Sequence, residues 1–257
     1  MKLAANRFTH AIRSGHKQIG LWASLASNFT AEVIAPSGYD WVLIDMEHSP
    51  NDLKSVMGQL QVYASGPTVA IVRPEWNDPV LVKRLLDIGA PGLLFPMVQT
   101  VAEAETAVAA TRYPPRGGRG VSGSTRANSF GRVADYFQRI EDETTVIVQL
   151  ETKSAVAQAD AIAAVDGVTG VFFGPADIAA DIGCLGKPTD PMVWDLIMPA
   201  ARNLIVKGVP VGTLVLDPKF AAELLSAGFT FVACGSDALL LARGADALLA
   251  QVKGVAE

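Results

Sequence analysis

Side chains that can do acid–base or metal chemistry gather at four places in the chain, each at the end of an apolar run. Asp45, Glu47 and His48 lie at the end of the run 41–47, and Arg73 lies at the end of 68–74. Gln149 and Glu151 lie at the end of 145–151, and Asp177 follows 170–175. Several carboxylates brought together are costly to bury unless a cation lies between them. The pattern therefore predicts one polar site that holds a cation.

Glu151 and Asp177 are the predicted metal ligands. They follow consecutive apolar runs, which would lie side by side in a parallel sheet. Two carboxylates without a nearby Cys or His pair suit a hard divalent cation, Mg²⁺ or Mn²⁺, which keeps positions for water and substrate. Such a site can chelate a 2-oxo acid through its carboxylate and keto oxygens and stabilise the enolate at the next carbon.

Arg73 and His48 supply the remaining chemistry of the predicted site. The Arg73 guanidinium would stabilise negative charge on the keto oxygen, and His48 is the obvious candidate for proton transfer, since histidine is the side-chain type that changes charge most readily around neutral pH. Two roles stay open for Asp45, which either caps the following helix or orients His48. Glu47 shares a strand face with Asp45 and is either a supporting partner of the site or part of an ion pair inside the fold.

The elements that must position these side chains repeat along the whole chain. Short strand-like runs alternate with helical stretches such as 78–90, 100–113 and 217–228. These stretches start at Asp or Thr, and two of them stop near Gly89 and Gly228. The runs are 19–24, 41–47, 68–74, 92–97, 145–151, 170–175, 210–215 and 229–235. Eight such repeats predict an α/β fold, a (β/α)8 TIM barrel in a single domain 1–257, with its site at the carboxyl ends of the strands. A doubly wound sheet is less favoured, since no Gly-rich phosphate turn follows the first run.

Composition excludes several other classes of protein. The chain has 257 residues, 50% of them hydrophobic, and a net charge of −5, which excludes intrinsic disorder. The only dense basic stretch is 116–120, so nucleic acid is not an expected partner, and no apolar run is long enough to cross a membrane. The N-terminal segment 1–18 predicts an amphipathic helix and not a signal peptide, because it lacks a continuous apolar core. Cys184 and Cys234 form no disulfide framework, which predicts the cytoplasm.

Longer segments resemble the class II pyruvate aldolases. They are YDWVLIDMEHSPND (39–52), VRPEWND (72–78), LLDIGAPGLLFPMV (85–98), RYPPRGGRGVSG (112–123), VQLET (148–152) and FGPADIA (173–179). The resemblance, to the 4-hydroxy-2-oxoheptanedioate and 2-dehydro-3-deoxyglucarate aldolase group of the citrate lyase β-subunit superfamily, covers almost the whole chain. It implies reversible cleavage of 4-hydroxy-2-oxo acids to pyruvate, or a related 2-oxo acid, and an aldehyde through a metal-bound enolate, with Mg²⁺, Mn²⁺ or Co²⁺ as cofactor.

The resemblance also implies a role for each matching residue. It implies that Glu151 and Asp177 bind the metal, that Arg73 contacts the keto oxygen, and that His48 performs acid–base chemistry with Asp45 close by and Asp87 paired with it. Gln149 and Trp22 would line the pocket, and the backbone of Pro175 and Ala176 would bind the pyruvate carboxylate. Leu214 and the loop 120–130 would select the aldehyde. Family members are homohexamers, trimers of dimers, in which the last helix is exchanged. The helix 236–254 here is apolar on more than one side, so we expect it to bury two faces.

Three other functions are compatible with parts of the pattern. A class I aldolase would form a Schiff base, for which Lys153 is the only lysine near a candidate strand end. An acyl-CoA lyase of the same superfamily would need a nucleotide-binding region, which the chain lacks. A non-catalytic 2-oxo acid binding protein would leave the acid–base set without a role. The basic loop 116–119 is interpreted as a subunit contact or as a site for an anionic substrate tail.

Overall fold

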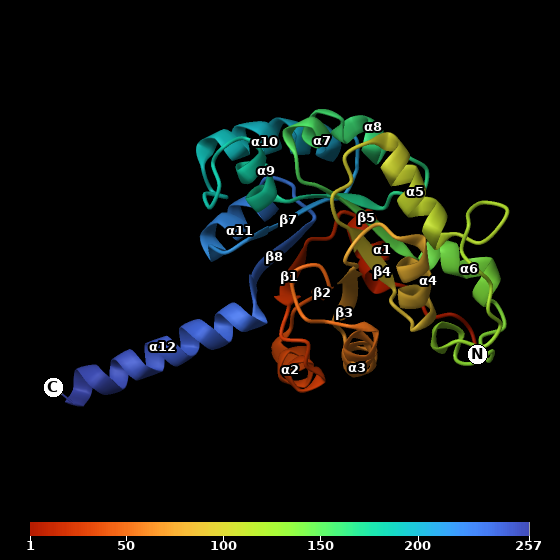
Figure 1. The fold of residues 1–257 in the computed structure, drawn as a ribbon, viewed down its shortest axis with the longest axis horizontal. Helices are drawn as coiled ribbons and strands as arrows, with labels where there is room; N and C mark the ends of the chain where they lie inside the picture. The colour runs from red at the N-terminus through yellow and green to blue at the C-terminus, as the bar shows by residue number, and fades with distance from the viewer. Residues whose placement is uncertain (257) are drawn as a thin grey trace.

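Eight parallel strands form a closed barrel in sequence order (Figure 1). The computed structural model describes residues 1–256, and side chains through residue 254. The strands are β1 (Gln18–Ala23), β2 (Trp41–Asp45), β3 (Val69–Arg73), β4 (Gly92–Phe95), β5 (Thr145–Leu150), β6 (Gly170–Phe173), β7 (Val211–Val215) and β8 (Phe231–Ser236). β1 pairs with both β2 and β8, so the ring has no free edge. The predicted (β/α)8 barrel is confirmed.

Helices surround this barrel, and the three crossovers from β4 to β7 have two α-helices each instead of the single helix that the repeat predicts. They are α1 (Arg7–Arg13), α2 (Asn28–Ile34), α3 (Leu53–Tyr63), α4 (Pro79–Asp87), α5 (Val101–Thr111), α6 (Tyr136–Glu143), α7 (Lys153–Ala157), α8 (Ala159–Ala163), α9 (Pro175–Asp181), α10 (Pro191–Val206), α11 (Pro218–Ser226) and α12 (Asp237–Ala256), with 3₁₀ turns at Ala35–Ser37 and Arg126–Asn128. The expected N-caps are present: Asp78, Thr100 and Asp217 accept N–H groups of α4, α5 and α11.

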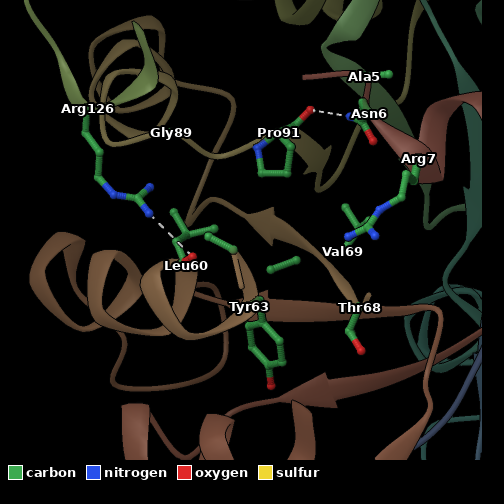
Figure 2. Close-up of a pocket in the computed structure, with 12 residues that line it drawn as sticks. Ala5, Asn6, Arg7, Leu60, Tyr63, Thr68, Val69, Gly89, Pro91 and Arg126 are labelled. Carbon is green, nitrogen blue, oxygen red and sulfur yellow. Dashed lines mark hydrogen bonds between the residues drawn. The ribbon is translucent and has the colours of Figure 1, made fainter. Parts of the chain in front are cut away.

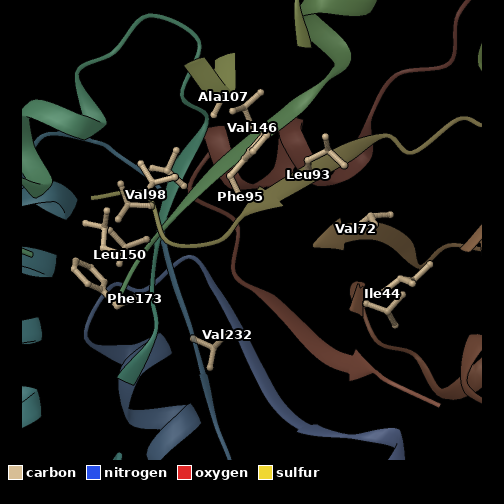
Figure 3. Close-up of a cluster of buried hydrophobic side chains, with 14 of the residues drawn as sticks. Ile44, Val72, Leu93, Phe95, Val98, Ala107, Val146, Leu150, Phe173 and Val232 are labelled. Carbon is tan, nitrogen blue, oxygen red and sulfur yellow. The ribbon is translucent and has the colours of Figure 1, made fainter. Parts of the chain in front are cut away.

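The strands are buried on both faces, as their continuous apolar runs predict. In β2, Val42 and Ile44 face outward into the layer between strands and helices, where Figure 3 shows part of the cluster. Trp41 and Leu43 face into the barrel. Phe8 of α1 packs against Trp41, with ring centroids 5.4 Å apart. Large side chains therefore fill the barrel interior and leave the carboxyl rim as the place for a site.

Two predicted elements differ from the structure. The N-terminal helix spans only Arg7–Arg13, because the Asn6 side chain caps its start and Gly15, with φ of +73°, turns the chain away. α12 runs away from the barrel (Figure 1), and four of its leucines, Leu240 and Leu248 among them, are exposed. The two buried faces predicted for this helix are therefore absent within one chain. None of the helices that the structure describes is long and apolar enough to span a membrane.

Candidate active site

A cavity of about 490 Å³ opens at the carboxyl ends of the strands. Most of the residues that the sequence pointed to line it: Trp22, His48, Arg73, Gln149, Pro175, Ala176, Asp177 and Leu214. Asp45 and Glu151 are buried behind this lining and contact Arg73 and Gln149. The barrel thus brings together residues that are separated by up to about 190 positions in the chain, as the strand-end pattern predicts.

Arg73 is fixed by two carboxylates from the end of the neighbouring strand β2. Its Nε and Nη2 each donate to Asp45 at 2.8 Å, and its Nη1 lies 2.8 Å from Glu47 Oε2. Burial alone would raise the pKa of Asp45, but the hydrogen bonds and charge of Arg73 hold that pKa below its usual value. Asp45 therefore stays ionised, and one N–H on each terminal nitrogen of Arg73 remains for a ligand.

Glu47 lies between the arginine and the histidine. Its Oε2 is 3.9 Å from His48 Nε2, and the His48 side chain is 66% exposed at the cavity. The Glu47 and His48 N–H groups are both within reach of Asp45 Oδ1. Glu47 is thus part of an ion pair with Arg73, which was one of its two open roles, and Asp45 orients the turn that carries His48. The cap of α3 is Asp52 and not Asp45.

Glu151 is a buried carboxylate without a cationic partner among the described residues. Its Oε2 accepts the Met97 N–H at 2.6 Å and its Oε1 accepts the Gln149 amide at 2.6 Å, and only 1% of the residue is exposed. Burial raises its pKa to about 8, and the nearby Asp177 carboxylate adds to this. Gly174 makes the arrangement possible, because a Cβ there would lie 2.9 Å from Glu151 Cγ.

The donor set at this point fits a hard divalent cation. Glu151 and Asp177 supply carboxylate oxygens, and the buried Gln149 Oε1 has no hydrogen-bond partner among the described residues. Within the described part of the chain no three His, Cys, Asp or Glu side chains are grouped as a closed metal site. Two protein carboxylates suit an ion that takes its other ligands from water and substrate, as Mg²⁺ does.

The other half of the cavity is apolar. Trp22 lies under the Arg73 guanidinium, with 5.3 Å from the guanidinium carbon to the ring centroid, and its ring packs on Phe172. Leu214 and Leu216, from β7 and the residue just after it, continue this wall. Sequence reasoning missed the residues beyond it, Pro188, Thr189, Asp217 and Arg243, because they lie in loops and helices and not at strand ends.

Asp87 lies away from this cavity in its own chain. It is the last residue of α4, which runs antiparallel to the strands, so it sits near the foot of the barrel. There it accepts Arg119 Nη2 at 2.8 Å, and the Arg119 side chain is fully buried beside Tyr113 and Tyr136. Arg119 is therefore enclosed within its own chain and does not line the cavity, and residues 120–130 do not line the cavity of their own chain either.

A smaller cavity of about 200 Å³ lies at the opposite, amino-terminal end of the barrel (Figure 2). Arg7 and Arg126 point toward it from two sides, but both are bound to backbone carbonyls: Arg7 to Gly66, and Arg126 to Ile88. Arg126 thus satisfies the carbonyl end of α4. The lining of this cavity includes no His, Cys, Asp or Glu side chain.

A closed (β/α)8 barrel with paired carboxylates and an arginine at its carboxyl rim is the architecture of a barrel enzyme. Residues 18–244 match the family model of HpcH/HpaI aldolase/citrate lyase, and the chain belongs to this family. The predicted family and the class of enzyme, a lyase of the aldolase type, are confirmed.

Individual relatives span nearly the whole chain. A pyruvate aldolase of Rhizobium etli is 50% identical over 251 residues, which are 98% of this chain and 99% of that protein. A 4-hydroxy-2-oxo-heptane-1,7-dioate aldolase of Salmonella dublin is 48% identical over 247 residues, 96% of this chain and 94% of the relative. The crystal structure of an HpcH/HpaI aldolase/citrate lyase family protein from Burkholderia cenocepacia is similar with a TM-score of 0.91 and 38% identity, over 97% of this chain and all of that one.

Proposed function

We propose that the chain is a divalent-metal-dependent class II aldolase that cleaves 4-hydroxy-2-oxo acids to pyruvate and an aldehyde, and catalyses the reverse addition. The observation that carries this proposal is that two neighbouring carboxylates, Glu151 and Asp177, lie with Arg73 at one cavity. The names of the relatives, pyruvate aldolase and 4-hydroxy-2-oxo-heptane-1,7-dioate aldolase, support the same reaction.

In this proposal Glu151 and Asp177 hold Mg²⁺ or Mn²⁺, with Gln149 supporting them. The ion, when bound, supplies Lewis-acid stabilisation of the 2-oxo acid. The backbone that opens α9 at Pro175 and Ala176 receives the carboxylate of the substrate. Pro175 has no N–H, so the donor is the Ala176 N–H, which has no partner within the helix. Trp22 packs against the three-carbon unit and shields it from water.

Arg73 and His48 perform the steps that need protein groups. Cleavage breaks the C3–C4 bond, leaves negative charge on the keto oxygen and releases the C4 hydroxyl proton. The free N–H groups of Arg73 donate to the keto oxygen as its charge grows. His48, directly or through a water molecule, accepts the hydroxyl proton and returns a proton to C3 of the enolate.

The test is release of pyruvate from a 4-hydroxy-2-oxo acid with and without EDTA. We expect activity to be lost in the chelator and restored by excess Mn²⁺; full activity in EDTA would rule out the metal role. Borohydride with pyruvate should leave the protein unmodified, because Lys153 is exposed and no lysine lines the cavity in the described part of the chain. Trapping of an adduct would support a class I mechanism, and pyruvate binding without turnover would support a binding protein. Cleavage only of acyl-CoA substrates would support an acyl-CoA lyase.

We further propose that residues 1–257 form one catalytic domain that acts in the cytoplasm as a homohexamer, a trimer of dimers. The exposed leucines of α12 suit exchange of this helix between subunits. The distance of Asp87 from its own cavity suits pairing with His48 of another subunit, which would make the site shared. Mass measurement in solution and the complementation experiment described in the Discussion test this arrangement.

A further inference from the structure

His48, the proposed proton-transfer group, lies on a turn and not on a strand or a helix. The turn, residues 47–51, follows the end of β2 and leads toward α3. Arg73 takes its position from the register of β3 with β2, but a turn lacks the regular backbone hydrogen bonds of a strand. The place of His48 at the cavity must therefore be set by the contacts that the turn makes with its surroundings.

The backbone carbonyl of Asp45 is the point to which this turn is attached. Asn51 Nδ2 donates to this carbonyl at 2.7 Å, and the Ser49 hydroxyl donates to it as well. Asn51 Nδ2 also donates to Ser49 Oγ at 2.9 Å, so the end of the turn is folded back on its start. His48 lies within the loop that these hydrogen bonds close, with its own N–H in reach of Asp45 Oδ1.

Gln59 connects this turn to α3 from inside the protein. Its amide nitrogen donates to Asn51 Oδ1 at 2.7 Å, and the Ser55 hydroxyl lies 3.0 Å from the same oxygen. Asn51 is 5% exposed and Gln59 is 2% exposed, although amide side chains mostly lie at the surface. Gln59 belongs to the face of α3 that packs Val56 and Leu60 into the core, so a buried amide at this position requires a hydrogen-bond partner.

The two amides hold each other in one orientation. Asn51 uses both N–H groups of its Nδ2 and both acceptor positions of its Oδ1. Rotation of the Asn51 amide by half a turn would place its N–H groups against the Gln59 N–H and would leave the Asp45 carbonyl without a donor from Asn51. Buried polar groups that lose their partners cost free energy, so the network favours a single conformation of the turn.

We propose that Asn51 and Gln59 are positioning residues of the reaction, which fix the place of the His48 imidazole at the cavity through the turn 47–51. This inference rests on the proposed function, in which His48 transfers the proton. Neither Asn51 nor Gln59 lines the cavity. Misplacement of a reacting group by about 1 Å can lower a rate by about 100-fold, so a buried amide pair behind the turn controls turnover without contact with the substrate.

Gln59→Met tests the proposal, because it keeps the size of the side chain and removes the hydrogen bond to Asn51. In the Mg²⁺-loaded protein we expect kcat for pyruvate release to fall by about 10- to 100-fold. The dissociation constant of pyruvate, measured by titration calorimetry, should not change, because Arg73 keeps its own partners. Hydrogen–deuterium exchange of a peptide that contains residues 46–51 should become faster.

Two further variants accompany Gln59→Met. Gln61→Met is the matched control, because it changes an exposed glutamine of the same helix, and it should equal the wild type in all three measurements. Ser49→Ala removes another hydrogen bond of the same network, to the Asp45 carbonyl, and should act in the same direction as Gln59→Met. It takes the place of Gln59→Met if unfolding midpoints show that Gln59→Met does not fold.

A double-mutant cycle with His48→Ala separates positioning from general damage. Because Gln59 acts through His48, Gln59→Met should change the residual kcat of His48→Ala very little. An equal fold loss of kcat with and without His48 would overturn the proposal. Weaker pyruvate binding at an unchanged kcat, or a wild-type kcat together with wild-type deuterium uptake, would overturn it as well.

Deuterium uptake also separates this proposal from the proposed function. If the wild type released no pyruvate from any 4-hydroxy-2-oxo acid, the aldolase proposal would be contradicted. Faster exchange of residues 46–51 in Gln59→Met would then still support the hold of Gln59 on the turn that carries His48. Unchanged exchange would contradict that hold whatever the activity.

Discussion

Asp45 and Arg73 face each other as a bidentate pair, with both N–H···O distances at 2.8 Å, at directly paired positions of β2 and β3. The pair is almost fully buried, and the remaining nitrogen of the same guanidinium, Nη1, pairs with Glu47. The plane of the guanidinium is therefore set by the strand register itself. A substrate that binds Arg73 meets a group that needs no rearrangement.

Asp45→Asn should damage both stability and activity. The change leaves a buried arginine with one carboxylate instead of two, so we expect the free energy of unfolding to fall by about 3 kcal/mol. Loss of orientation of Arg73 should lower kcat by roughly 100-fold. Urea denaturation and steady-state kinetics measure the two effects. Asp166→Asn is the control, because that carboxylate also pairs with arginines but its side chain is 81% exposed, and its removal should leave activity unchanged.

Gly174→Ala should weaken metal binding with little loss of stability. The added Cβ would lie 2.9 Å from Glu151 Cγ and 3.2 Å from the Gln149 amide nitrogen, so the Glu151 carboxylate must move. Displacement of a ligand or its hydrogen-bond partner typically lowers metal affinity about 10- to 100-fold. Calorimetry with Mn²⁺ measures the affinity. Gly118→Ala, at a glycine with open space around it, should bind Mn²⁺ like the wild type; a similar loss in both variants would contradict the placement of the metal.

The barrel and most of its rim could be predicted from the sequence because parallel strands carry strong local signals. Strands buried on both faces read as continuous apolar runs, and a polar residue that ends such a run is conspicuous. Asp45, Arg73 and Glu151 were found in this way, and the structure places them within or beside one cavity. The strand bounds differ from the predicted runs by at most two residues at either end.

The remaining features depend on contacts between distant segments, which local patterns do not encode. Nothing near Arg119 in the sequence indicates that it is buried against Asp87 and Tyr136. Arg243 belongs to a leucine-rich helix and resembles an ordinary surface arginine until the start of α12 is seen to be tied to β1. The exposed leucines of that helix could not be predicted either, because exposure depends on where the helix lies relative to the barrel.

His48→Ala should abolish most turnover without destabilising the fold. The side chain is 66% exposed, so the free energy of unfolding should change by less than about 0.5 kcal/mol. Loss of a group that transfers the proton should lower kcat by about 100- to 10,000-fold with a small change in KM. His16→Ala, an exposed histidine distant from the cavity, is the control; a normal kcat in His48→Ala would remove this residue from the mechanism.

Glu143, at the amino-terminal end of the barrel, should make the free energy of unfolding decline in acid. Its carboxylate accepts the Asn6 N–H at 2.7 Å and pairs with Arg139 and His10. Burial opposes ionisation, but these partners outweigh it and hold the pKa of Glu143 below its usual value. The stabilisation is therefore complete above the pKa of the unfolded chain and is lost as pH falls through the lower folded value.

Urea midpoints of wild type and Glu143→Gln between about pH 7 and pH 3 check this sign. The wild type should be the more stable at pH 7, and the difference should shrink as the pH falls. Glu105→Gln, at an exposed glutamate without an ion pair in the described structure, should give a constant difference. If the difference between wild type and Glu143→Gln grew as the pH fell, the lowered pKa of Glu143 would be contradicted.

Subunit mixing tests whether a site takes His48 from one chain and Asp87 from another. His48→Ala and Asp87→Ala should each be nearly inactive alone, since each removes one member of the pair from every site. When the two variants are unfolded together and refolded as mixed oligomers, a shared site regains both intact residues wherever a chain with His48 meets a chain with Asp87. Random mixing in equal amounts should restore about one quarter of the sites. If His48 and Asp87 had to come from one chain, no site would regain both, and activity would stay at the level of the single variants.

Because Asp87 also binds the buried Arg119, unfolding midpoints of the single variants must accompany the assay. Asp87→Asn, which keeps an acceptor for Arg119, serves as the second complementing partner should Asp87→Ala fail to fold.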